Sequence, residues 1–293
     1  MNLFGFIVLF MNIDFNTALK LHYHNLSNKE KDIAEYIKKN ISNLKFTNLD
    51  ELATATNSSN SSISRFVRKL GFENYQQMRI SFHIDHQSDF KNKILPAKIS
   101  PDDSALEISN SVFQTGINSL VSTQSILHES DLLKAVKILE KAQNCIAFGM
   151  GGSTVIALNA YHRFLKSSLN CSIPMDFHMQ LIQANRLNEN DCALIISHTG
   201  RNKDMIRIVD ILNKNNVPII VITSNVSSPI AQASDCILLS ISEETNYQPE
   251  ALSSMVAQLL LVDALFILYS VKVDKDMSYY ALARDLINET RIQ

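Results

Sequence analysis

Apolar residues follow two different patterns along this chain, and the change falls near residue 85. Before it, apolar positions recur at helical spacing in segments rich in Asn, Ser and Lys, and no run resembles a strand. After it, short apolar runs alternate with helical segments. Residues 85–104 (DHQSDFKNKILPAKISPDDS) contain two prolines and little periodicity, as interdomain linkers do. The pattern therefore predicts a helical domain over residues 1–84, a linker over 85–104 and a second domain over 105–293.

The second domain is predicted to be α/β. Helical segments at 105–128 and 131–141 precede five strand candidates, which are 144–149, 171–175, 192–197, 217–224 and 236–241. Further helical segments fit between these strands at 154–168, 178–187, 202–215 and 229–233. Apolar strands that alternate with helices of this length are typical of a parallel sheet covered on both faces. We therefore expect a three-layer α/β sandwich with a five-stranded parallel sheet.

Two apolar segments raise the question of a membrane. Residues 3–10 (LFGFIVLF) are too short to span a bilayer, and because Met11 follows at once, residues 1–16 are either a mis-assigned start or a flexible extension. Residues 251–271 are long enough to span a bilayer, but Ser253, Ser254, Gln258 and Asp263 interrupt them, so we expect a buried core or subunit-interface helix. With 46% apolar and 19% charged residues overall, we expect a cytoplasmic globular protein with no membrane partner.

Residues 47–72 predict a helix-turn-helix. A short helix that Thr47 or Asn48 can cap is followed by a turn ending at Ser59, which stands where the N-cap of a second helix belongs. The apolar residues of that second helix recur at helical spacing: Ile63, Phe66, Val67 and Leu70. Gly71 then ends the helix in the C′ position.

The outer face of this second helix combines small hydroxyls with cations, as a helix that contacts DNA bases and phosphates does. The expected DNA-binding residues are Ser59, Ser61, Ser62, Ser64, Arg65, Arg68 and Lys69. Residues 26–83 hold nine Lys/Arg and six Asp/Glu, a net charge of +3, whereas the whole chain carries −2. The alternative is a helical cap whose cations form only a solvated face.

Two turns in the second domain are candidates for binding a phosphate. Segments 149–153 (GMGGS) and 197–202 (SHTGRN) each follow a strand and open a helix, where hydroxyls and the helix N-terminus stabilise an anion. Segment 149–153 is neither a dinucleotide fingerprint nor a P-loop. Adjacent Ser197 and His198 are badly placed as a nucleophile and its base. The expected effector-binding residues are Gly151, Gly152, Ser153, Ser197, His198, Thr199 and Asn202.

Cysteine and histidine patterns predict neither a metal site nor a cofactor. Cys145, Cys171, Cys192 and Cys236 are 26, 21 and 44 residues apart in order, and three lie in or beside apolar strands, so we expect buried thiols. The pairs His22/His24 and His83/His86 lack a third ligand and are expected on the solvated surface.

The segment RFVRKLGF (65–72), with the helix-turn-helix around it, resembles the N-terminal domain of the RpiR family of bacterial transcriptional regulators. The two glycine-containing turns resemble those of the sugar-isomerase (SIS) domain, and AQLLLVDALF (257–266) resembles a string of the same regulator family. Departures from the family patterns are Ser62 for Thr, Asn202 at the last position of the second turn and Met255 for Arg.

This resemblance implies a SIS-like fold and contact of Ser153, Ser197 and Thr199 with a phosphate. It further implies a homodimer, or a dimer of dimers, that binds operator DNA of a sugar-catabolism operon. A phosphosugar effector (a hexose or amino-sugar phosphate) would control that binding.

The SIS resemblance leaves an enzyme as the alternative, because aldose–ketose phosphate isomerases share the domain. Isomerisation needs a carboxylate base and a ring-opening His, and Glu250 with His178 or His198 is available. Glu250 does not fall in register with the isomerase pattern, however, and Glu243 or Glu244 are the other acids nearby. An enzyme would also not need an exposed helix rich in Ser and Arg. We therefore expect a regulator and not an enzyme, with the roles of His198 and Glu250 left open.

Overall fold

The computed structural model describes residues 15–44, 48–84, 99–242, 251–276 and 278–291. The chain divides into two compact units, Met1–Leu95 and Pro96–Gln293. Most of the expected N-terminal extension, residues 85–98 of the expected linker, and the three acids Glu243, Glu244 and Glu250 lie outside the described residues.

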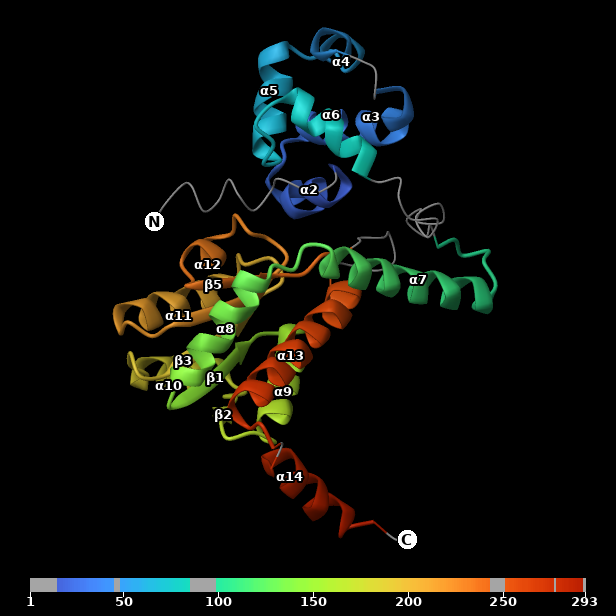
Figure 1. The fold of residues 1–293 in the computed structure, drawn as a ribbon. Helices are drawn as coiled ribbons and strands as arrows, with labels where there is room; N and C mark the ends of the chain where they lie inside the picture. The colour runs from blue at the N-terminus through green and yellow to red at the C-terminus, as the bar shows by residue number, and fades with distance from the viewer. Residues whose placement is uncertain (1–14, 45–47, 85–98, 243–250, 277, 292–293) are drawn as a thin grey trace. The chain divides into compact units, whose positions relative to one another are not determined.

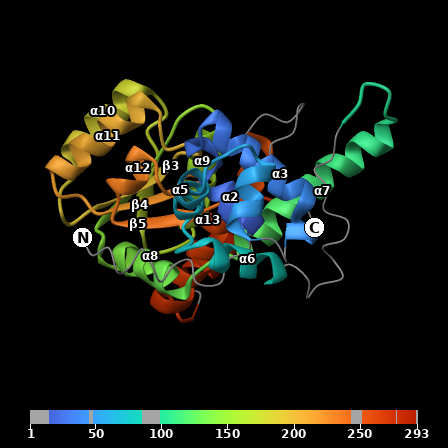
Figure 2. The same ribbon diagram turned by 90° about the horizontal axis from the view of Figure 1, so that it is seen from above.

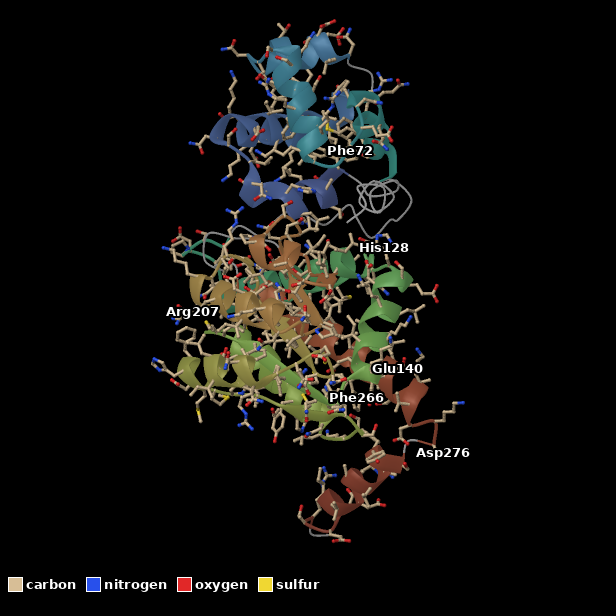
Figure 3. The ribbon with its side chains drawn as sticks, turned by 90° about the vertical axis from the view of Figure 1, so that its left-hand side faces the viewer. Phe72, His128, Glu140, Arg207, Phe266 and Asp276 are labelled. Carbon is tan, nitrogen blue, oxygen red and sulfur yellow. The ribbon has the colours of Figure 1, made fainter. Side chains whose placement is uncertain are left out.

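The described part of the first unit is all helical, as predicted. Its elements are α2 (Phe15–His22), the short 3₁₀ helix η1 (Tyr23–Asn25), α3 (Asn28–Leu44), α4 (Leu49–Ala55), α5 (Asn60–Lys69) and α6 (Tyr75–Ile84). Phe15 and Phe82 meet edge to face with their ring centroids 5.3 Å apart, which joins the first helix to the last. Phe66 and Leu70 are buried in the same core, so the apolar stripe of α5 points inward. Phe72, the one residue of this group that Figure 3 labels, is buried there too.

The second unit contains the predicted five-stranded parallel sheet. The strands are β1 (Asn144–Gly149), β2 (Asn170–Ser172), β3 (Cys192–Ile196), β4 (Ile219–Thr223) and β5 (Cys236–Leu239), in the order β2-β1-β3-β4-β5. The expected strand 171–175 is wrong beyond Ser172. It is an edge strand, and Pro174, which has no N–H to donate, follows shortly after it.

Helices cover both faces of this sheet (Figures 1 and 2). One face packs against α8 (Glu129–Lys141), α9 (Ser153–Phe164) and α13 (Ala251–Val273). The other packs against α10 (Phe177–Arg186), α11 (Lys203–Lys214) and α12 (Pro229–Gln232). Helix α7 (Ala105–Gln124) packs on α13, and α14 (Ser278–Asn288), which buries none of its residues, extends away from the sheet (Figure 1). The three-layer architecture is confirmed.

Helix α13 includes a stretch, Ser254–Val273, that is long and apolar enough to cross a membrane by length and composition. In this fold it is a core helix, because Leu261, Leu265 and Phe266 are buried against the sheet layer. The ring of Phe266 (labelled in Figure 3) lies edge to face on Phe164 of α9, with centroids 5.8 Å apart.

The four cysteines are free thiols and all are buried, as expected. Cys145, Cys171 and Cys192 lie in register on three neighbouring strands. Burial raises the pKa of the Cys236 thiol to about 12, so it stays protonated. No group of three metal-ligating side chains occurs among the described residues.

One histidine prediction is wrong. His22 is 6% exposed, not solvated, because it ends α2 on the side that packs into the helical core. Burial lowers the pKa of His22 to about 4.

Candidate functional site

The helix-turn-helix is formed by α4 and α5, and local capping sets its limits. Asn48, not Thr47, is the N-cap of α4: its side chain accepts the Glu51 N–H at 2.9 Å in a capping box. Ser59 caps α5 as predicted, accepting the Ser62 N–H at 3.2 Å. Gly71, with φ at +91°, lies just past the end of α5, where a residue with a Cβ would be strained.

All seven predicted DNA-binding residues are exposed or half-buried. At the start of α5, the Ser59 hydroxyl oxygen lies 2.9 Å from both Ser61 Oγ and Ser62 Oγ. One turn later, Arg65 Nη2 donates to Ser62 Oγ at 3.2 Å. A cluster of hydroxyls therefore leads into a row of cations along one helix face.

The cations of α5 are not equivalent. Lys69 Nζ lies 2.8 Å from Glu30 Oε2 of α3, so part of its charge is compensated within the protein. Burial would raise the pKa of Glu30, but hydrogen bonds from Lys69 and Ser27 lower it overall, so this partner stays ionised. Arg65 and Arg68 are exposed on the same helix.

The second site lies where the order of the sheet reverses. Strands β1 and β3 are neighbours, with Gly149 paired to Ile196, and the chain leaves them toward opposite faces of the sheet, into α9 and α11. In open parallel sheets the ligand crevice lies at such a switch point, beyond the carboxyl ends of the strands. Both predicted turns, 149–153 and 197–202, are therefore brought to one place.

Glycines are required at two positions in these turns. A Cβ on Gly149 would lie 2.6 Å from the backbone oxygen of Ser153, which is closer than real Cβ contacts. Gly200 has φ at +63°, and its Cβ would lie 2.0 Å from Ser228 Oγ. The first glycine allows α9 to begin directly above β1, and the second allows the β3–α11 turn to pack on the start of α12.

A cavity of about 220 Å³ opens between these turns. Its described lining residues are Met150, Gly152, Ser153, Ile196, Ser197, His198, Thr199, Asn202, Met205, Ser254, Met255 and Gln258. The fold thus brings together six of the seven predicted effector residues, while Gly151 is not in the lining. The sequence did not predict the wall of the cavity that α13 supplies through Ser254, Met255 and Gln258.

The described lining contains one ionisable side chain. Among the described lining residues, His198 alone has a titratable side chain, and none is Lys or Arg. An anion here would be stabilised by hydroxyls and by the N-terminal ends of α9 and α11, both 12 residues long. The first N–H groups of α9 already have partners, since Ser153 N donates to the Met150 carbonyl at 3.1 Å and Thr154 N to that of Gly151 at 3.1 Å. The Ser153 hydroxyl is thus a more available donor to an anion than these backbone N–H groups are.

Asn202 has a structural role in addition to its place in the lining. Its Oδ1 accepts the Met205 N–H at 3.0 Å as the N-cap of α11. The side-chain nitrogen Nδ2 of Asn202 could then still donate a hydrogen bond to a ligand.

Comparison with known proteins agrees with this arrangement. The family model of the helix-turn-helix domain of the rpiR family matches residues 13–89, and that of the SIS domain matches residues 138–268. The chain is 28% identical over 249 residues to the HTH-type transcriptional regulator RpiR of Escherichia coli, covering 85% of this chain and 83% of that protein. It is 28% identical over 242 residues to HexR of Pseudomonas aeruginosa, covering 82% and 83%.

Two solved structures share the fold. The Vibrio vulnificus NanR protein, solved in complex with ManNAc-6P, aligns with a TM-score of 0.60 at 21% identity, over 95% of this chain and 100% of that one. The sugar isomerase domain of an RpiR transcription factor from Sphaerobacter thermophilus aligns with a TM-score of 0.56 at 19% identity, over 62% and 99%.

A helix-turn-helix unit followed by an α/β unit with a polar pocket at its switch point defines a class of two-domain transcriptional regulators. The two family models and the curated relatives identify the family within that class. The chain belongs to the RpiR family of helix-turn-helix transcriptional regulators, with a SIS domain as its C-terminal part. Its relatives are regulators, which confirms the expectation of a regulator and not an enzyme.

Proposed function

We propose that this protein is a cytoplasmic regulator of a sugar-catabolism operon whose operator affinity is set by a phosphosugar bound in the SIS pocket. The observation that carries the proposal is the pocket itself. Ser153, Ser197 and Thr199 come from two separate turns yet line one cavity at the switch point. Hydroxyls at helix N-termini, without acids among the described lining residues, suit a phosphomonoester. The NanR relative, solved with ManNAc-6P, supports an amino-sugar phosphate as one candidate.

We further propose that α5 is the recognition helix. Its N-terminal hydroxyls would approach base edges in the major groove, while Arg65 and Arg68 would contact backbone phosphates. The exposed position of these residues and the inward packing of Phe66 and Val67 support this role.

The functional state in this proposal is a homodimer, or a dimer of dimers, assembled through the SIS domains. The support comes from the surface. Among the described residues, exposed large apolar side chains all occur from Leu106 onward, including Phe113 of α7 at 71% and Leu260 of α13 at 51%. Apolar surface of this extent marks an interface. A symmetric dimer would present two α5 helices to half-sites about 34 Å, one helical turn, or a multiple of this apart.

The test is a titration of the purified full-length protein with a panel of hexose and amino-sugar phosphates, following thermal stability and operator binding together. We expect one of them to raise the melting temperature and to change the DNA affinity. Ser197→Ala should weaken both effects. The matched control, Ser234→Ala, removes a hydroxyl that donates to the Ile230 carbonyl on α12, outside the described lining, and should behave as the wild type. No stabilisation by any sugar phosphate would refute the ligand half of the proposal.

A further inference from the structure

A row of buried hydroxyls connects two walls of the pocket. His198, from the turn after β3, has its ring Nδ1 2.9 Å from Ser224 Oγ. Ser224 Oγ lies 2.8 Å from Ser240 Oγ, which also accepts a hydrogen bond from Gln258 Nε2 of α13 at 3.1 Å. Ser240 is 0% and Gln258 1% exposed, so water does not compete for these bonds. His198 and Gln258 both line the cavity, whereas Ser224 and Ser240 lie behind it.

The direction of this row follows from the donor at its Gln258 end. Ser240 has one hydroxyl proton, and Gln258 already supplies the donor on one side. Two acceptors are within reach of that proton: Ser224 Oγ at 2.8 Å and the Thr223 carbonyl oxygen at 3.5 Å. The carbonyl also accepts the Ser240 N–H at 2.9 Å. Because the contact with Ser224 is the shorter of the two, the Ser240 hydroxyl donates its proton to Ser224 Oγ.

That direction determines the protonation of the imidazole. Because Ser224 Oγ accepts from Ser240, its own proton is directed at His198 Nδ1. A ring nitrogen that accepts a hydrogen bond carries no proton, so the neutral ring has its proton on Nε2. We propose that Ser224 and Ser240 are positioning residues that hold the neutral His198 ring as the Nε2–H tautomer.

The inference does not depend on the proposed function, because it concerns which ring nitrogen of His198 carries the proton in the ligand-free protein.

The same row couples His198 to the amide of Gln258. If that amide turned over, Oε1 would face Ser240 and every donor in the row would reverse, which would place the imidazole proton on Nδ1. The proton position of His198 therefore reports which way Gln258 is oriented.

The tautomer can be read in the ligand-free protein. Full-length protein labelled with ¹⁵N in its histidines would be studied by long-range ¹H–¹⁵N correlation spectra at a pH where the ring is neutral. His198→Asn identifies the signals. We expect Nδ1 to be unprotonated and Nε2 protonated in the wild type, and a mixture of tautomers in Ser240→Ala. The control is Ser167→Ala, which removes a buried hydroxyl that donates to the Phe164 carbonyl at 2.7 Å, and it should leave the His198 spectrum unchanged.

A proton on Nδ1 in the wild type would overturn the inference, and so would an Nε2–H tautomer that persists undiminished in Ser240→Ala. If Ser240→Ala does not fold, the wild-type spectrum still decides the tautomer. Failure of the wild type to bind any phosphosugar would refute the proposed function and leave the tautomer result standing, so the two claims fail separately.

Discussion

Arg163 of α9 and Asp263 of α13 form a two-point ion pair. Arg163 Nε donates to Asp263 Oδ1 at 2.7 Å, and Nη2 donates to Oδ2 at 2.7 Å. Asn159 Nδ2 adds a third contact to Oδ1 at 3.3 Å. The carboxylate that interrupts the most apolar of the described helices is therefore held by its neighbour in the same layer. This explains how a helix long enough for a membrane belongs to a folded domain.

The first prediction concerns this pair. Asp263→Asn should lower the free energy of unfolding by about 1 kcal/mol, since a two-point pair near the surface is stronger than a one-point pair. Glu140→Gln is the matched control, because Glu140 (labelled in Figure 3) accepts a single contact from Lys272 at 2.9 Å; a few tenths of a kcal/mol is expected there. Urea denaturation measures both. Equal losses in the two variants would contradict the argument.

The second prediction separates the cations of α5. Arg68→Ala should weaken binding to a non-specific duplex and reduce the slope of log K against log salt by about 1. Lys69→Ala should have less effect, because Glu30 already compensates its charge at 2.8 Å. Conversely, Glu30→Gln should strengthen binding by releasing that charge. Fluorescence anisotropy at several salt concentrations gives all three slopes, and identical slopes for the Arg68 and Lys69 variants would mean that the Glu30 pair does not persist on DNA.

The third prediction uses two glycines of one turn. Gly149→Ala should destabilise the protein by about 1–3 kcal/mol, the usual cost of overpacking, because the new Cβ would meet the Ser153 backbone oxygen. Gly152→Ala should stay within about 1 kcal/mol of the wild type, since its nearest new contact is Met255 Sδ at 3.9 Å. Thermal unfolding distinguishes them. A stable Gly149→Ala protein would show that the start of α9 can shift away from β1.

The fourth prediction is a pH dependence of the helical unit. Burial lowers the pKa of His22 to about 4, against about 6.5 in the unfolded chain. The unfolded state therefore binds the proton more readily, so stability is complete above about pH 6.5 and falls as the pH drops toward 4. For this one group the loss between pH 7 and 5 is about 2 kcal/mol.

Hydrogen-exchange mass spectrometry of peptides from α2 measures that loss. His22→Gln should reduce the pH dependence over this window. His178→Gln, which changes a side chain that is 84% exposed, should not. If the His22 variant keeps the full dependence, another group is responsible.

The parts of the fold that sequence predicted are those set by short-range chemistry. Ser59 and Gly71 were found because a cap acts on N–H or C=O groups within a few residues, and the strands were found because buried parallel strands are apolar throughout. The ends of helices are predicted less accurately than their positions. Helix α7 ends at Gln124, whereas the sequence pattern predicts a helix up to His128. The burial of His22 could not be predicted, since it depends on how α2 packs in three dimensions.

The site was predicted only as far as its two turns. Gln258 and Ser254 reach the pocket from a helix more than 50 residues beyond Thr199, so only the fold brings them together. Ser224 and Ser240 gave no sequence signal, because a serine after a strand is as common in ordinary turns as behind a binding site.

The uneven distribution of exposed apolar side chains has a consequence beyond assembly. In the described part of the Met1–Leu95 unit no large apolar side chain is exposed. These residues therefore pack around a core of their own and present no apolar surface that another domain would have to cover. If the two units bind DNA and a phosphosugar as proposed, joining the helical unit to another domain that dimerises at a suitable spacing would transfer its DNA specificity. Recombination could then exchange the two specificities without redesigning either core.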